Sequence, residues 1–268
     1  MTASLRLGRV FGIPIEVHVS WILVFLLLTY LLAGQFDDVR PHWTAAQTWS
    51  VAVIAVVLFF LSVLAHELSH SVMALSKGIP VRGITLFIFG GVSRLEHEPQ
   101  RPITEFVVAL VGPLISILLA GMFGGVWYLL GRGDSAPEMV LLLLAWTNLS
   151  LGVFNLVPGY PLDGGRLLRA GIWGLTGDHR RATRIAAGMG QAVGGAMVLG
   201  GVIVAVRWEP VDGMWLGVVG MFLFSMARSS FPKYSRGAKG AGFKLSQPSY
   251  AKMSSRTKSG HEGRCTYG

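Results

Sequence analysis

Three side chains that can bind a metal or move a proton lie close together in an otherwise apolar run, residues 59–78. They are His66, Glu67 and His70, in the sequence AHELSH. On a helix, His66 and His70 lie one turn apart on one face, so a single metal ion can contact both imidazoles. Zinc binds neutral histidine nitrogens, and the H-E-x-x-H spacing leaves the carboxylate as a general base for hydrolysis. The motif therefore predicts a catalytic zinc site.

The apolar surroundings of the motif strengthen this prediction. An ionisable group inside a membrane-spanning helix costs at least about 2.5 kcal/mol on insertion scales. Three such groups in neighbouring turns need a partner, and a bound metal ion supplies one. The alternative is a polar cluster that faces another helix, and we favour the metal.

The third zinc ligand must come from elsewhere in the chain, because a catalytic zinc usually has three protein ligands. The single cysteine, Cys265, excludes a cysteine-based site. Asp163 follows an apolar segment in NLVPGYPLDGG, where prolines and glycines break regular helix and let the chain fold back. We expect Asp163 to be this ligand; the alternative is an N-cap for a helix that starts at Gly164.

Other polar residues near the spans have more ordinary interpretations. Glu16 and Glu105 stand at span entrances, where an acid is usually solvated or caps a helix. Asn155 lies in apolar sequence and can either hold a substrate carbonyl or bridge two helices. The sequence does not decide between these two roles.

Composition indicates an α-helical integral membrane protein: 52% of the 268 residues are hydrophobic and 14% charged, with a mean hydropathy of +0.55. Six segments are long enough to span a bilayer, about 17–33, 49–76, 106–130, 140–157, 186–206 and 211–227.

The net charge of +9 is better explained by membrane topology than by nucleic-acid binding. Of the 23 Lys and Arg residues, six spans leave only Arg40, Arg132 and Arg207 on the side opposite the termini. Both termini are therefore expected in the cytoplasm. The N-terminus has no signal-peptide pattern, so we expect the first span to be retained.

Residues 84–89 have the composition of a β-strand but are too short to cross the membrane. Gly90 and Gly91 are expected to form the turn that follows. A strand at membrane depth must be buried in protein or line a cavity. We expect a re-entrant strand or hairpin near the active site; the alternative is an apolar loop on the surface.

We expect two regions, a membrane domain at residues 1–230 and a basic, disordered cytoplasmic tail at residues 231–268. The tail is rich in small and polar residues and cannot bury a core. Its charge suits contact with anionic lipid headgroups.

The HELSH and NLVPGYPLDG motifs together resemble the site-2 proteases, which are intramembrane zinc metalloproteases. The opening LGRVFGIPIEVHVSW, the FGG at 89–91 and the GP at 112–113 resemble the bacterial and archaeal branch that carries CBS modules. The resemblance covers about residues 5–228. After that point only the basic tail follows, which argues against nucleotide-type regulation and is compatible with a truncated gene product.

The resemblance implies one zinc per chain and cleavage within or near the transmembrane segment of a single-pass membrane regulator, such as an anti-sigma factor, in a bacterial cell membrane.

Two alternative functions are a metal transporter and an inactive membrane scaffold. A metal transporter would need a polar relay that the last two spans lack, and an inactive membrane scaffold would not need a full ligand set. The expected site residues are His66, His70 and Asp163 for zinc, Glu67 as catalytic base, and Asn155, Gly90 and Gly91 as support for the substrate or transition state.

Overall fold

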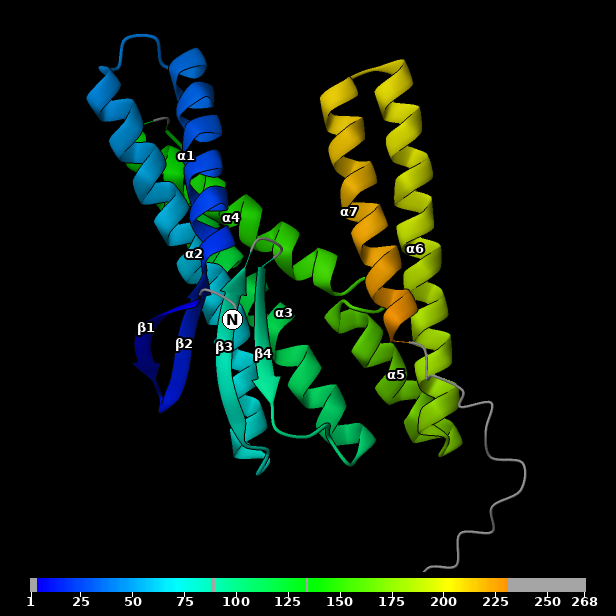
Figure 1. Cartoon of the computed structure of the whole chain (residues 1–268). Coiled ribbons are helices and arrows are strands. Elements are labelled where there is room, and N and C mark those ends of the chain that lie inside the picture. The colour runs from blue at the N-terminus through cyan, green and yellow to red at the C-terminus, as the bar shows by residue number, and fades with distance from the viewer. Residues whose placement is uncertain (1–3, 88–89, 134, 231–268) are drawn as a thin grey trace, which may run out of the picture. The chain divides into compact units, whose positions relative to one another are not determined.

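The computed structural model describes residues 4–87, 90–133 and 135–230. Most of this part of the chain is helical, and the helices accompany one small sheet (Figure 1). In chain order the elements are β1 (Ser4–Val10), β2 (Ile13–His18), α1 (Val19–Val39), α2 (Ala45–Ser76), β3 (Val81–Phe87), β4 (Gly90–Leu95), α3 (Pro102–Leu129), α4 (Ala136–Asn155), α5 (Asp163–Thr176), α6 (His179–Arg207) and α7 (Pro210–Ser229).

The predicted membrane spans are confirmed. Within the described ranges, six helices are long and apolar enough to cross a bilayer, namely α1, α2, α3, α4, α6 and α7. The protein is therefore a multi-pass membrane protein. Helix α2 has 32 residues, a length of roughly 48 Å at 1.5 Å per residue. This exceeds a hydrocarbon core of about 30 Å, and the H-E-x-x-H motif lies toward the C-terminal end of the helix.

Helix α5 lies between the fourth and fifth predicted spans, where the sequence analysis considered a helix only as part of the alternative role of Asp163. It has 14 residues and ends at Gly177, whose φ of +70° is the left-handed conformation that glycine favours. Its first turn packs closely on the preceding segment: a Cβ at Gly164 or Gly165 would overlap the backbone of residues 156–160. The two glycines therefore let α5 start directly beside the end of α4.

The sheet has the order β1-β2-β3-β4. Strands β1 and β2 form an antiparallel hairpin, β2 pairs in parallel with β3, and β3 pairs antiparallel with β4. The N-terminal hairpin was not predicted, because its pairing partner lies beyond two long helices. The expectation of a short β segment near the motif is confirmed, although Phe89, the last residue of the expected strand, lies outside the described residues.

One detail of that expectation is wrong. Gly90 and Gly91 do not form a turn, because they are the first residues of β4 and pair with Phe87 and Leu86. Strand β3 lies inside the sheet, since β2 and β4 flank it on both sides. Among the described strands, β1 and β4 are the edges.

The sheet packs its apolar face on α1 and α2. Buried Ile13, Val17, Ile84 and Leu86 form a cluster with partly buried residues of the helices, including Trp21, Leu64 and Leu68. Leu64 precedes the H-E-x-x-H motif on α2, and Leu68 lies within it. The sheet therefore lies beside the candidate site, with its inner face covered by protein, as a strand at membrane depth requires.

Helices α6 and α7 form a closely packed pair (Figure 1). A Cβ at Gly194 would contact Gly220, and a Cβ at Gly201 would contact Gly213 across the same interface. Small residues at such positions let two helix backbones approach, as is common in membranes. Gly190 instead lies against the backbone of Tyr160, so the small residues of α6 allow close contact with two neighbours rather than one.

The division of the chain at residue 230 stays a prediction. Helix α7 ends at Ser229, and the expected tail, residues 231–268, lies outside the described residues.

We predict that Gly213→Ala destabilises the α6–α7 pair. A methyl group there would overlap the backbone of Ala205 on α6, and overpacking of this kind costs about 1–3 kcal/mol. The thermal unfolding midpoint in detergent, followed by circular dichroism, should fall. Gly217→Ala is the matched control on the same helix, because no atom lies within 4 Å of its added methyl group. Equal midpoints for the two variants would contradict the packing described here.

Candidate metal centre

Helix α2 presents His66 and His70 to one buried point. Both side chains are almost fully buried, and their Nε2 atoms lie 3.3 Å apart. Their rings meet edge to face, with centroids 4.9 Å apart. The helix thus brings the two imidazole nitrogens together as the spacing of the motif predicts.

Asp163 reaches the same point from the start of α5. Its Oδ2 lies 3.2 Å from His66 Nε2 and 3.1 Å from His70 Nε2, and the residue is 8% exposed. The alternative role as an N-cap is wrong, because the N-cap of α5 is Leu162 and the Asp163 carboxylate faces the imidazoles. The fold thus brings together the three residues chosen from the sequence, and their donor atoms form a group that could hold a metal ion.

The geometry of these three atoms fits zinc. They form a nearly equilateral triangle with sides of 3.1 to 3.3 Å. Two ligands of a tetrahedral zinc with bonds of about 2.0–2.1 Å are separated by roughly 3.3 Å. Two histidine nitrogens and one carboxylate oxygen also form the donor set of many catalytic zinc sites, with a fourth position open.

Contacts from α3 orient both imidazoles. His70 Nδ1 donates to the carbonyl oxygen of Val108 at 2.6 Å, and a hydrogen bond of 2.9 Å joins His66 Nδ1 to Ser116 Oγ. Because a carbonyl can only accept, a neutral His70 carries its proton on Nδ1 and presents a lone pair at Nε2. That lone pair faces the Asp163 carboxylate, and a cation between them satisfies both acceptors.

Gly112 on α3 makes room for the two rings. A Cβ at this position would overlap the His70 ring and lie 2.9 Å from His66 Nε2. The glycine of the GP motif is therefore required at this point by the volume of the imidazoles.

Glu67 lies between the metal centre and the sheet. A Cβ on Gly91 would overlap Glu67 Cγ, so β4 approaches this side chain closely. A hydrogen bond of 2.8 Å between Ser71 and Ser93 also joins α2 to β4. Gly91 therefore contacts a candidate catalytic side chain, whereas Gly90 has no atom within 4 Å of its Cβ position.

Asn155 does not bridge two helices. It is the last residue of α4, and its amide donates to the carbonyl of Leu151 on the same helix at 2.9 Å. The bridging amide is Asn148, which is buried and donates to Ser62 Oγ on α2 at 3.1 Å. The sequence analysis did not select Asn148, and a role of Asn155 in substrate support stays a prediction.

The interpretation of Glu105 as a solvated or capping acid is wrong. Its side chain is fully buried on α3, and its Oε1 accepts a hydrogen bond of 2.6 Å from Nε of Arg169 on α5. Arg169 is 5% exposed and was not selected from the sequence. The only sequence signal for this pair was that each charge stands in a largely apolar segment. Glu16, in contrast, forms a more exposed pair with Arg94 on the sheet.

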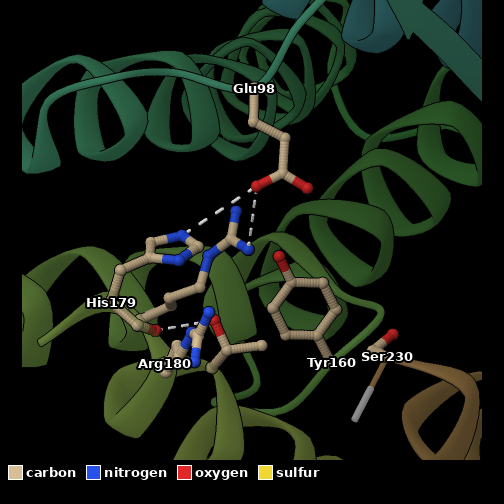
Figure 2. Close-up of a pocket in the computed structure, with 7 residues that line it drawn as sticks. Glu98, Tyr160, His179, Arg180 and Ser230 are labelled. Carbon is tan, nitrogen blue, oxygen red and sulfur yellow. Dashed lines mark hydrogen bonds and ion pairs between the residues drawn. The ribbon is translucent and has the colours of Figure 1, made fainter. Parts of the chain in front are cut away.

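A pocket of about 250 Å³ opens beside Arg169 and contains none of the three candidate ligands (Figure 2). Glu98 accepts from Arg169 at 3.4 Å and lies 3.9 Å from His179 Nε2, so one carboxylate faces both the guanidinium and the imidazole. Burial raises the pKa of Tyr160 to about 12, so its hydroxyl stays neutral. The pocket is lined by Glu98, Tyr160, Arg169, His179, Arg180, Thr183 and Ser230.

Comparisons with known proteins agree with this site. The model of peptidase family M50 matches residues 54–139 and 132–200. A Synechocystis protein is 38% identical to this chain, and the match covers 86% of this chain and 60% of that protein. Rip3 of Mycobacterium tuberculosis is 36% identical, and the match covers 91% of this chain and 63% of Rip3. Both are provisionally named zinc metalloproteases. The chain thus spans 60–63% of the length of these two curated relatives.

Among solved structures, a site-2 protease from Methanocaldococcus jannaschii matches with a TM-score of 0.59. It is 30% identical in sequence, and the match covers 85% of this chain and 95% of that chain. The likeness therefore extends over nearly the whole of that solved chain.

We predict that Gly112→Ala removes or greatly weakens metal binding, because its methyl group would occupy the space of the His70 ring. Metal content per chain, measured by elemental analysis after purification in detergent, should fall well below that of the parent. Gly121→Ala on the same helix is the control, since nothing lies within 4 Å of the added methyl group. Parental metal content in Gly112→Ala would show that the rings do not need this space.

Proposed function

The chain belongs to peptidase family M50, and on that premise we propose that it is an intramembrane zinc endopeptidase. The observation that carries this proposal is the buried triangle of His66, His70 and Asp163 donor atoms, with sides of 3.1 to 3.3 Å, beside Glu67. Two of its three corners lie on a long apolar helix, α2, and the third lies at the start of α5. A hydrolytic site in such a place acts on peptide bonds that lie in or near the membrane.

Each residue of the site has a distinct task in this proposal. His66, His70 and Asp163 hold one zinc, which when bound acidifies a water molecule and polarises the scissile carbonyl. Glu67 takes the proton from the attacking water and passes it to the leaving nitrogen. Val108 and Ser116 keep the imidazoles in place, and Asn155 assists at the substrate.

The substrate must present an extended backbone to this site, because a helix hides its carbonyls in hydrogen bonds. Strand β4 is suited to hold it. It is an edge strand, it lies against Glu67 at Gly91, and Ser93 ties it to α2. A substrate segment that adds to this edge gains main-chain hydrogen bonds beside the catalytic base.

We further propose that the substrate is a single-pass, membrane-anchored regulatory protein, such as an anti-sigma factor. A bilayer-embedded site selects substrates that enter from the lipid phase. With both termini in the cytoplasm, the charge distribution places the C-terminal end of α2, and so the motif, near the cytoplasmic face. Cleavage there would release a cytoplasmic domain.

We predict about one zinc per parent chain and loss of that zinc in both His66→Ala and Asp163→Ala. The two ligands come from α2 and α5, so equal losses would show that one ion joins these separate elements. Zinc would be measured by elemental analysis of protein purified in detergent. Retention of zinc in Asp163→Ala would mean that the third ligand is a different residue.

Glu67→Gln separates binding from catalysis in the same experiment. It should keep the zinc and abolish cleavage of a membrane-anchored reporter, because the amide cannot accept the proton. Cleavage by this variant at the parental rate would exclude the mechanism. A parent chain that binds zinc but cleaves no membrane substrate would favour an inactive scaffold.

We predict that a cysteine at Val92 on β4 forms a disulfide with a cysteine near the scissile bond of a trapped substrate. Val92 is 46% exposed on the edge beside Glu67. The experiment uses the Glu67→Gln, Cys265→Ser background, so that the substrate stays intact and no other thiol competes. Crosslinking would be read on gels after mild oxidation in membranes.

Leu7→Cys provides the control for this experiment. Leu7 is 63% exposed on β1, the other edge of the same sheet. Equal crosslinking at both positions would indicate random collision rather than strand addition at β4.

A further inference from the structure

A buried charged pair lies outside the metal centre and has no role in the mechanism above. Arg169 approaches Glu105 Oε1 with two nitrogens, Nε at 2.6 Å and a terminal nitrogen that also contacts it. Glu105 Oε2 has no hydrogen-bond partner among the described residues. Arg169 therefore supplies the charge balance of a carboxylate that is fully buried, an arrangement that is costly unless its geometry is good.

Helix α3 is the element that connects the sources of the metal ligands. His66 and His70 come from α2, and Asp163 comes from α5. Helix α3 packs against both α2 and α5, whereas α2 and α5 meet chiefly through the side chains of the metal centre. Helix α3 thus contributes to the position of Asp163 relative to the imidazoles.

One face of α3 carries all the contacts concerned. Glu105, Val108, Gly112 and Ser116 recur at intervals of three and four residues, which places them on a single stripe of the helix. Val108 and Ser116 bond the imidazoles, and Gly112 gives them space. Glu105 extends the same stripe toward α5.

Arg169 holds α5 at a second point beyond the ligand. It lies six residues after Asp163, roughly 9 Å further along the helix axis. Its guanidinium also lies 5.2 Å from the centre of the Tyr160 ring and 3.4 Å from Glu98 Oε2 (Figure 2). Tyr160 belongs to the segment that leads into Asp163, so one side chain fixes both this segment and α5 against α3.

We propose that Glu105 and Arg169 are positioning residues for the metal centre. Their ion pair fixes α5 against α3 and thereby sets the place where the Asp163 carboxylate meets the two imidazoles. This inference rests on the proposed zinc site and assigns neither residue a contact with the metal or the substrate.

The first test measures zinc affinity of the full chain in detergent by competition with a chromophoric chelator. Glu105→Gln should weaken zinc binding about 10- to 100-fold, the usual effect of losing a contact that orients a ligand. Arg169→Lys keeps the positive charge but loses the two-nitrogen contact, so it should also weaken zinc binding, but less than Glu105→Gln does. The absorption bands of the cobalt-substituted protein should shift in both variants, because the ligand geometry changes.

The double variant Glu105→Gln, Arg169→Met separates positioning from a general loss of stability. It removes the pair without leaving an unpaired buried charge. If Glu105→Gln weakens zinc binding only because it leaves Arg169 as an unpaired buried charge, the double variant should regain the parental zinc affinity. If the pair positions Asp163, zinc binding should stay weak and the cobalt spectrum should stay altered.

Glu16→Gln is the matched control, because it breaks another carboxylate pair of the same length, 2.6 Å to Arg94, on the sheet. It should bind zinc as the parent does. Parental zinc affinity in all Glu105 and Arg169 variants would overturn this inference while leaving the zinc site intact. Recovery of parental zinc affinity in the double variant would overturn it as well. A parent chain that binds no zinc would overturn the proposed function itself, and this inference with it.

Discussion

Polar and charged side chains that this fold places among its apolar helices need partners there, and this requirement organises the molecule. An ionisable group at membrane depth is expensive when it is unpaired. His66 and His70 meet Asp163, and Glu105 meets Arg169. Each of these contacts joins α5 to a spanning helix. The short helix that is not apolar enough to span thus supplies the counter-charges for two helices that are.

Close approach of backbones makes these contacts possible. The start of α5 lies on the segment that follows α4, where Gly164 and Gly165 leave no room for a side chain. Gly112 admits the two imidazoles, and Gly91 lets a strand lie on Glu67. In lipid, where apolar surface provides little driving force between helices, such fits determine which elements can be neighbours. The formation of the metal centre therefore depends on these glycines as well as on the ligands themselves.

The parts that could be predicted from the sequence were those with a local signal. Six apolar segments of sufficient length predicted the spans, and the H-E-x-x-H motif predicted two zinc ligands and a catalytic base. Asp163 could be chosen because it follows a predicted span in a segment where prolines and glycines break regular helix. Glu105 was misinterpreted because an acid in the first turn of a helix is usually solvated, and its burial depends on an arginine 64 residues later. Long-range pairing of this kind leaves no local pattern.

The same limit applies to the sheet and to the bridging amide. Strand β2 acquires its second partner only when β3 returns beside it after α1 and α2. Asn148 looks like any polar residue in a span until Ser62 is placed opposite it. The composition of residues 84–89 indicated a strand, but it could not show that β4 rather than β3 would be the free edge.

The origin of the third ligand also has a consequence for biosynthesis. A growing chain exposes His66 and His70 long before Asp163 leaves the ribosome, and Arg169 follows later still. Until α5 has docked beside α3, the two imidazoles lack the carboxylate that completes their triangle. The order of synthesis thus keeps the centre incomplete until the first four spanning helices have been made, and the metal centre can form only after the second half of the protein has been synthesised.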